Sequence, residues 1–132
     1  MNDNELSKAA LALLCTIGGF LFGEMNGLVV TLVFLIVMDY ISGIIAAIAE
    51  KNLSSEIGAK GIAKKIFMLL IVAAANIVDT NVIGEGHVLK SVTVFFYIAN
   101  ECISLFENAG RLGVPVPKKL LEILEQLKNK NN

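Results

Sequence analysis

Polar and ionisable side chains recur inside the most apolar stretches of this sequence, and they are the residues able to carry function. In and just after the stretch 88–106 they return every three or four positions, and so share one face of a helix. They are Lys90, Thr93, Tyr97, Asn100, Glu101, Ser104 and Asn108. Asp39 and Ser42 form a similar narrow face in a second stretch, and Asn76 lies in a third. A charge at the centre of a bilayer costs roughly 2.5–3.5 kcal/mol, so Asp39 and Glu101 need a partner, water or a proton.

Three interpretations of this polar face are open. In the first, the polar groups hydrogen-bond between helices and hold a bundle or an oligomer together. In the second, many copies form a ring, and each contributes one polar stripe to a water-filled lumen. A single stripe is too narrow to enclose water in a monomer. The third interpretation is a proton-coupled transport site. The sequence thus predicts a face that lines a pore or joins subunits, without deciding between these roles.

Catalytic, cofactor and metal sites are not predicted. His87 is the single histidine, and it stands in a polar turn without a cysteine nearby. Glycine-rich phosphate loops after a strand are absent, and so is a basic stripe interleaved with aromatics, which argues against nucleic acid as a partner. Cys15 and Cys102 lie in apolar stretches and are expected to be packing residues. The sequence therefore predicts a protein that is not an enzyme.

The elements that must position these residues are membrane helices. Of the 132 residues 55% are hydrophobic, and the mean hydropathy is +0.71. Because about 20 residues span a bilayer, the apolar stretches predict an all-α membrane protein with four helices in two hairpins. The predicted transmembrane domain is 1–110, with helices at about 9–23, 27–49, 62–79 and 88–107. The first is short and contains Gly18 and Gly19, so three spanning helices are the alternative.

Positive charge is confined to alternate segments, which predicts the orientation. The N-terminal segment, the middle connection and the tail are basic, whereas the other two connections hold no lysine or arginine. The basic residues are Lys8, Lys51, Lys60, Lys64, Lys65, Arg111, Lys118, Lys119, Lys128 and Lys130, with Lys90 as the exception. Short loops rich in lysine and arginine stay in the cytoplasm. We therefore expect a multi-pass protein with both termini cytoplasmic, and Lys64 and Lys65 snorkelling to the cytoplasmic surface.

Two further segments are predicted to lie outside the hydrocarbon. The middle connection, 50–65, is expected to lie on the inner leaflet before it turns into the third helix. Residues 111–132 are expected to form a cytoplasmic basic tail, in which Pro115 and Pro117 stop the fourth helix and an amphipathic helix starts at Lys118. That helix would rest on anionic lipid or pack against other copies. Small residues are expected where helices pack closely, namely Gly19, Gly23, Gly43 and Ala46.

Short motifs in a fixed order resemble the phage-lysis and toxin-secretion holins of Gram-positive bacteria. They are Asp39-Tyr40-Ile41-Ser42-Gly43, the segment 53–61 followed by Lys64-Lys65, Ala99-Asn100-Glu101, the segment 104–108, and 113–120. The resemblance covers roughly residues 27–127. It implies a self-assembling homo-oligomer in the bacterial cytoplasmic membrane, which forms large pores that release or activate an endolysin or allow toxin export. It implies no direct contact with the endolysin, and an antiholin as a further partner.

Two other functions are compatible with the residues. A small multidrug-type transporter or ion channel would use a membrane-embedded carboxylate, for which Asp39 and Glu101 are candidates, but the chain has no tryptophan and two tyrosines to surround a substrate. An antiholin or regulatory membrane subunit would differ little in sequence from a holin. The subunit number and the diameter of a pore do not follow from the sequence.

Overall fold

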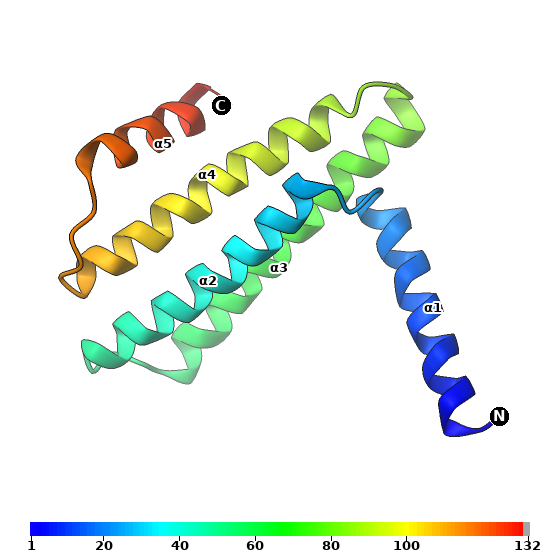
Figure 1. Ribbon diagram of the computed structural model, residues 1–132, viewed down its shortest axis with the longest axis horizontal. Helices are drawn as coiled ribbons and strands as arrows, with labels where there is room; N and C mark the ends of the chain where they lie inside the picture. The colour runs from blue at the N-terminus through cyan, green and yellow to red at the C-terminus, as the bar shows by residue number, and fades with distance from the viewer. Residues whose placement is uncertain (131–132) are drawn as a thin grey trace.

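The chain is all-helical over residues 1–130, which the computed structural model describes (Figure 1). The elements are α1 (Asp3–Phe22), α2 (Gly27–Ala49), α3 (Ser55–Val78), a π-helical turn η1 (Asp79–Ile83), α4 (Val88–Arg111) and α5 (Lys118–Lys130). Helices α1, α2 and α4, and α3 extended through η1, are long and apolar enough to cross a membrane. The predicted all-α membrane fold with an additional C-terminal helix is confirmed. Residues 131 and 132 of the predicted tail lie outside the described residues.

Side-chain caps determine where three of the helices begin. The side-chain oxygens of Asn2, Asn26 and Ser54 each accept a hydrogen bond from the backbone N–H three residues on, at 2.9, 3.1 and 3.2 Å. Such N-caps satisfy N–H groups that have no partner in the first turn. The first and third helices therefore start earlier than the predicted residues 9 and 62. A prediction from the length of an apolar stretch leaves out the polar residues of the first turn. Residues 55–65 form the start of α3, and the predicted break before the third helix is absent from this described segment.

Helices α2, α3 and α4 form a three-helix bundle with an apolar core in one half. Leu32, Val72 and Val94 are at most 1% exposed and belong to one cluster with Val29, Ile36 and Met68. These residues lie in the half of the bundle that ends at residues 79–87, called here the 79–87 end. The opposite end carries the α2–α3 connection and Arg111, and is called the 50–54 end. The core thus leaves the half toward the 50–54 end for polar residues.

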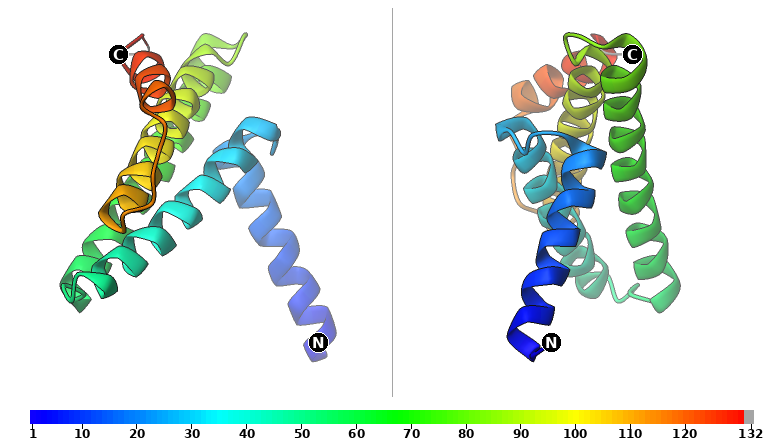
Figure 2. Two further views of the ribbon diagram at one scale, coloured as in Figure 1. Left: turned by 60° about the vertical axis from the view of Figure 1, so that its left-hand side comes forward. Right: turned by 90° about the vertical axis from the view of Figure 1, so that its right-hand side faces the viewer.

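Helix α1 diverges from the bundle and is held at its C-terminal end (Figure 2). No side chain of α1 is buried by the described part of the chain. Asn76 of α3 donates to the carbonyl oxygen of Leu21 at 3.0 Å, and the Lys90 ammonium of α4 donates to that of Phe22. These donors satisfy carbonyl groups that a helix C-terminus leaves unpaired, and the Lys90 charge complements the helix dipole.

Gly23 and Gly19, which the sequence predicted at close helix contacts, have different surroundings within the single chain. Gly23 has a φ of +66°, and a Cβ there would lie 2.9 Å from Oδ1 of Asn76. Glycine is therefore required at this turn, where α1 ends against Asn76 and Lys90. A Cβ on Gly19 would meet nothing within 4 Å. Within the described chain, Gly19 therefore packs against no other helix.

The α4 N-terminus is capped from a distance by Asp79. His87, the residue before α4, has a left-handed backbone and makes no capping bond with its side chain in the described structure. Asp79, which is 1% exposed, instead accepts from the backbone N–H groups of Leu89 at 3.2 Å and Lys90 at 2.7 Å. A carboxylate at this position also complements the positive end of the helix dipole. Asp79 thereby fixes how α4 leaves the connection after α3.

Candidate functional site

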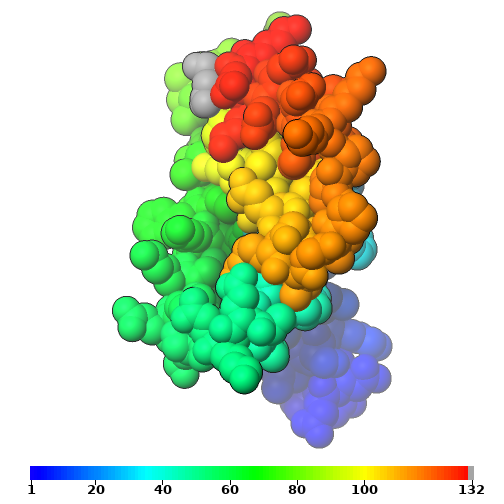
Figure 3. All heavy atoms as spheres, turned by 90° about the vertical axis from the view of Figure 1, so that its left-hand side faces the viewer, coloured from blue at the N-terminus to red at the C-terminus, as the bar shows by residue number. Residues whose placement is uncertain are grey.

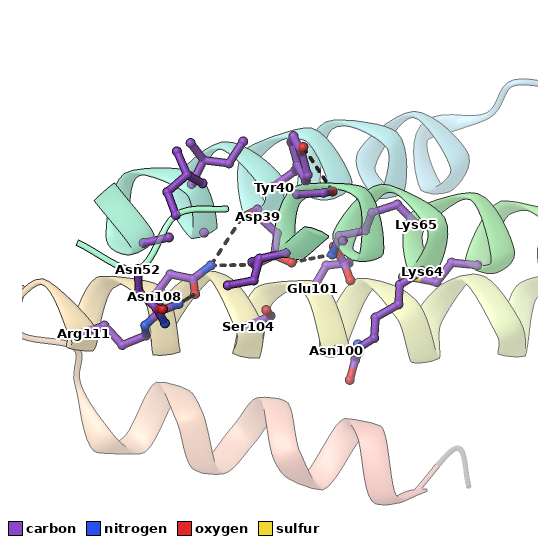
Figure 4. Close-up of a pocket in the computed structure, with 18 residues that line it drawn as sticks. Asp39, Tyr40, Asn52, Lys64, Lys65, Asn100, Glu101, Ser104, Asn108 and Arg111 are labelled. Atoms are coloured by element: carbon purple, nitrogen blue, oxygen red, sulfur yellow. Dashed lines mark hydrogen bonds and ion pairs between the residues drawn. The ribbon is translucent and has the colours of Figure 1, made fainter. Parts of the chain in front are cut away.

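Three helices meet in a buried ionic cluster (Figure 4). The ammonium group of Lys65 on α3 forms ion pairs with Asp39 of α2 and Glu101 of α4. Glu101 is 1% exposed and Asp39 is 6% exposed. Each of the three residues lies ten positions from the last or first residue of its helix at the 50–54 end (49 − 39, 65 − 55 and 111 − 101). At 1.5 Å per residue this places the cluster about 15 Å inside the bundle, on one level.

The position of Lys65 corrects the prediction that it snorkels to the membrane surface. Because α3 begins at Ser55, Lys65 lies nearly three turns inside the helix and turns toward the two carboxylates. Lys64, its neighbour, is exposed. A cation between two acidic groups offsets part of the cost of burying them, and removing it would leave uncompensated buried charges. The cluster therefore requires Lys65 in this orientation.

Hydrogen bonds extend the cluster to the surface at the 50–54 end. The Asn108 amide donates to Oδ1 of Asp39 at 3.0 Å and to Oγ of Ser42 at 2.9 Å. Arg111 donates to Oδ1 of Asn108 at 3.1 Å and binds both carboxylate oxygens of Glu50, at 3.0 and 2.8 Å. We call this continuous chain of contacts the polar ladder, made of Glu50, Arg111, Asn108, Asp39, Lys65 and Glu101.

The outer rung of the ladder is exposed to solvent. The Arg111 guanidinium holds the pKa of the Glu50 carboxyl below its ordinary value, chiefly through their hydrogen bonds. A lowered pKa in the folded state means that the pair stabilises the fold above the ordinary pKa of a glutamate. That contribution is lost as the pH falls through the lowered pKa. Both side chains are about 40% exposed (40% and 39%), so the pair contributes little compared with the buried cluster.

A cleft of about 370 Å³ leads from the 50–54 end toward the ionic cluster. Asn100 and Ser104 of the predicted polar face line it together with every ladder residue except Glu50. The Tyr40 hydroxyl donates to the carbonyl oxygen of Gly58 at 3.4 Å across the cleft. A Cβ on Gly61 would come 3.4 Å from the Tyr40 ring, so this small residue allows α3 to lie close to Tyr40. The cleft is wide enough to admit water to the cluster.

The residues of the predicted polar face therefore lie in several separate parts of the structure. Lys90 and Asn76 hold α1 at the 79–87 end, far along the helices from the ladder. Thr93 donates to the carbonyl oxygen of Leu89 in its own helix at 2.6 Å. Tyr97 packs against the apolar core and makes an edge-on contact with Phe96, with ring centroids 5.4 Å apart. In the single chain, most of this face is directed into the bundle and bonds within the subunit.

The small and basic residues that the sequence singled out also differ in their surroundings. Ala46 is 0% exposed, and a Cβ on Gly43 would lie 3.5 Å from the Asn108 amide, so these small residues lie where α2 packs on α4. Lys60, Lys64, Lys118 and Lys119 of the predicted cytoplasmic basic residues are exposed. Sequence reasoning missed the pairing of Lys65 with two acidic groups. Their equal depth from one end of the bundle is the signal that would have revealed it.

The membrane-length helices and their buried ladder define a multi-pass helical membrane protein. Residues 16–129 match the sequence model of the bacteriophage holin family, and the chain belongs to that family. An uncharacterized protein of Halalkalibacterium halodurans is 41% identical over 93% of this chain and 94% of its own length. The probable holin of Bacillus phage phi105 is 37% identical over 86% of this chain and 82% of its own length. An uncharacterized protein of Clostridium perfringens is 38% identical, with 95% and 93% covered. No solved structure matches.

Replacing Lys65 with an apolar residue of similar length tests whether the ionic cluster holds the bundle together. Lys65→Met should destabilise the protein by about 3–5 kcal/mol, because it leaves two buried carboxylates without a cation. The measurement is reversible unfolding in mixed micelles. Lys64→Met, at the exposed neighbouring position, is the matched control. Adding Asp39→Asn and Glu101→Gln to Lys65→Met should restore much of the stability. A Lys65→Met protein as stable as the parent would contradict this role.

Proposed function

We propose that this protein is a holin that oligomerises in the bacterial cytoplasmic membrane and opens lesions large enough to release or activate an endolysin. The observation that carries the proposal is the family match over residues 16–129, together with a relative named as a probable holin in a phage. The endolysin is a functional partner and need not touch the holin. We propose no catalytic role for the chain itself.

The exposed apolar surface supports assembly in a bilayer. Helix α1 has 20 residues, and Leu11, Leu14 and Phe20 on it are 62%, 67% and 65% exposed. The described chain covers none of these side chains, so lipid or another subunit must do so. Because a lipid tail is as apolar as leucine, helices associate in a membrane through close packing and polar contacts. A helix attached at one end can exchange lipid neighbours for another subunit without disturbing the three-helix bundle.

For the polar ladder we propose a structural role within each subunit. Its groups are paired with one another, so facing a lumen would require them to exchange these partners for water. The ladder would then keep α2, α3 and α4 together as one unit while whole subunits associate. This selects, among the three interpretations, the one in which polar groups hold helices together.

A small transporter is the second candidate function, and the cleft is the observation that favours it. The cleft leads from the 50–54 end to Asp39 and Glu101, the carboxylates that such a protein would use. The lysine between them already neutralises one of the two charges, which leaves less affinity for a cationic substrate. An antiholin is distinguished from a holin by the lysis experiment below.

We also propose that the N- and C-termini lie in the cytoplasm. Lysine and arginine are concentrated at the 50–54 end and in the tail, whereas the 79–87 end contributes Lys90, which is bonded to α1. Lys90 binds the C-terminal end of α1 in the structure. It is therefore not a free positive charge of this connection, and it does not count against the orientation that the loop charges predict.

Expression in bacteria together with a cytoplasmic muralytic enzyme tests the holin function. We expect membrane potential to collapse and the culture to lyse abruptly, because the lesions let the enzyme reach the peptidoglycan. Culture turbidity and a potential-sensitive dye are the readouts, and the same enzyme without this protein is the control. Normal growth at high membrane levels of the protein would refute the holin role. Delayed lysis when it is co-expressed with a known holin would then identify an antiholin.

Cysteine labelling tests the orientation. On a Cys15→Ser, Cys102→Ser background, Asn81→Cys should react with a membrane-impermeant maleimide added to intact cells. Asp3→Cys should react only after the membrane is permeabilised, because we expect it in the cytoplasm. Both positions are exposed in the structure, so folding does not protect either thiol. Labelling of Asp3→Cys from outside would mean that α1 does not cross, and that three helices span.

A further inference from the structure

Helix α5 folds back along α4 instead of leaving the bundle. It starts at Lys118, after the turn that follows α4, and runs antiparallel to α4 on the outer side of the bundle (Figure 1). The space-filling view shows α5 lying over α4 at the surface of the molecule (Figure 3). The predicted amphipathic helix therefore exists, and it covers the outer surface of α4.

The covered surface of α4 is apolar and faces away from the ladder. Ala99 and Ile103 are 3% and 8% exposed, although each is about 160° around the helix from Glu101 at 100° per residue. Helices α2 and α3 bond to the Glu101 side, so α5 is the described element that buries Ala99 and Ile103. On α5 itself, Leu121 and Leu124 are half-buried, which places them on the side that meets α4.

The surface of α5 that does not meet α4 carries most of its charges. Its exposed residues include Lys118, Lys119, Glu122, Glu125 and Lys130, beside an exposed apolar strip of Leu120, Ile123 and Leu127. The helix has 13 residues, so it extends about 20 Å back along α4 from the 50–54 end. If α4 spans the membrane, these charges lie at membrane depth, where each costs roughly 2.5–3.5 kcal/mol toward the centre when lipid surrounds it. A folded-back α5 is therefore stable in a membrane when its charged side meets water.

We propose that α5, folded onto α4 as in this structure, forms the polar wall of the lumen in the assembled lesion. This inference rests on the proposed holin function. The ladder uses most of the polar face of α4 inside the subunit, so a lumen needs another polar surface along a membrane-spanning helix. Helix α5 provides one, with Leu121 and Leu124 toward α4 and with Lys119, Glu122 and Glu125 on its exposed surface. In isolated subunits surrounded by lipid, α5 leaves α4 and rests on the cytoplasmic surface of the membrane, and this is the state in which the C-terminus is cytoplasmic.

A disulfide between the facing sides of α4 and α5 tests the folded-back arrangement. On a Cys15→Ser, Cys102→Ser background, Ile103→Cys and Leu124→Cys should cross-link in liposomes, and the oxidised protein should release trapped dextran as well as the reduced protein does. Ile103→Cys with Gln126→Cys, on the outer side of α5, is the control that should not cross-link. No cross-link in leaking liposomes, or release only after reduction, would overturn the inference. No release from the reduced protein would instead refute the proposed function.

Tryptophan fluorescence then tests which surroundings the outer side of α5 meets. The chain has no tryptophan, so one introduced residue reports alone. In the cross-linked protein, Gln126→Trp should be quenched by iodide in the buffer and not by lipids brominated in mid-chain. Phe95→Trp, on the exposed outer surface of α4, should show the opposite preference. Quenching of Gln126→Trp by brominated lipid would place α5 against the bilayer and refute a lumen-lining role.

Discussion

A charge removed from water must meet an opposite charge, and in this protein that requirement fixes how three helices pack. Lys65 can satisfy both Asp39 and Glu101 only if α2, α3 and α4 place these residues at one depth, which they do, ten positions from the 50–54 end. A shift of one helical turn, about 5.4 Å, would separate the charges in a medium that penalises unpaired ions. The cluster therefore sets the vertical register of the bundle, whereas apolar packing alone tolerates several registers.

At the 79–87 end, buried charged side chains are paired with helix termini and not with side chains of opposite charge. Asp79 accepts from the first N–H groups of α4, and Lys90 and Asn76 donate to the last carbonyl groups of α1. Each charged side chain meets the end of a helix dipole of opposite sign. Between the two polar regions lies the apolar core around Leu32, Val72 and Val94. In the bundle of α2, α3 and α4, the apolar core therefore lies between two polar regions.

The helices could be predicted from the sequence because apolar length and loop charge are local properties. The start of α1 could not, since Asn2 extends the helix through a polar first turn, and neither could the unbroken continuation of the helix capped by Ser54 into the third membrane-spanning segment. The polar face of the fourth helix was visible from its spacing, but its partners were not. Lys65 appeared to be one lysine among several near a surface, and the earlier start of α3 is what places it among the carboxylates. Its neighbour Lys64 is exposed, so the composition of this segment could not show which of the two lysines is buried.

The contacts between helices show which helices move as one unit and which can change position. Helices α2, α3 and α4 are joined by the ladder and by a core, so they move together. Helix α1 is held through its last turn, and α5 is held through an apolar contact that lipid could replace. Rearranging either helix breaks none of the buried ion pairs, so the free energy of assembly does not have to include the cost of exposing them. A membrane protein built in this way can change its neighbours through α1 and its hydration through α5, and its charge cluster remains intact in both states.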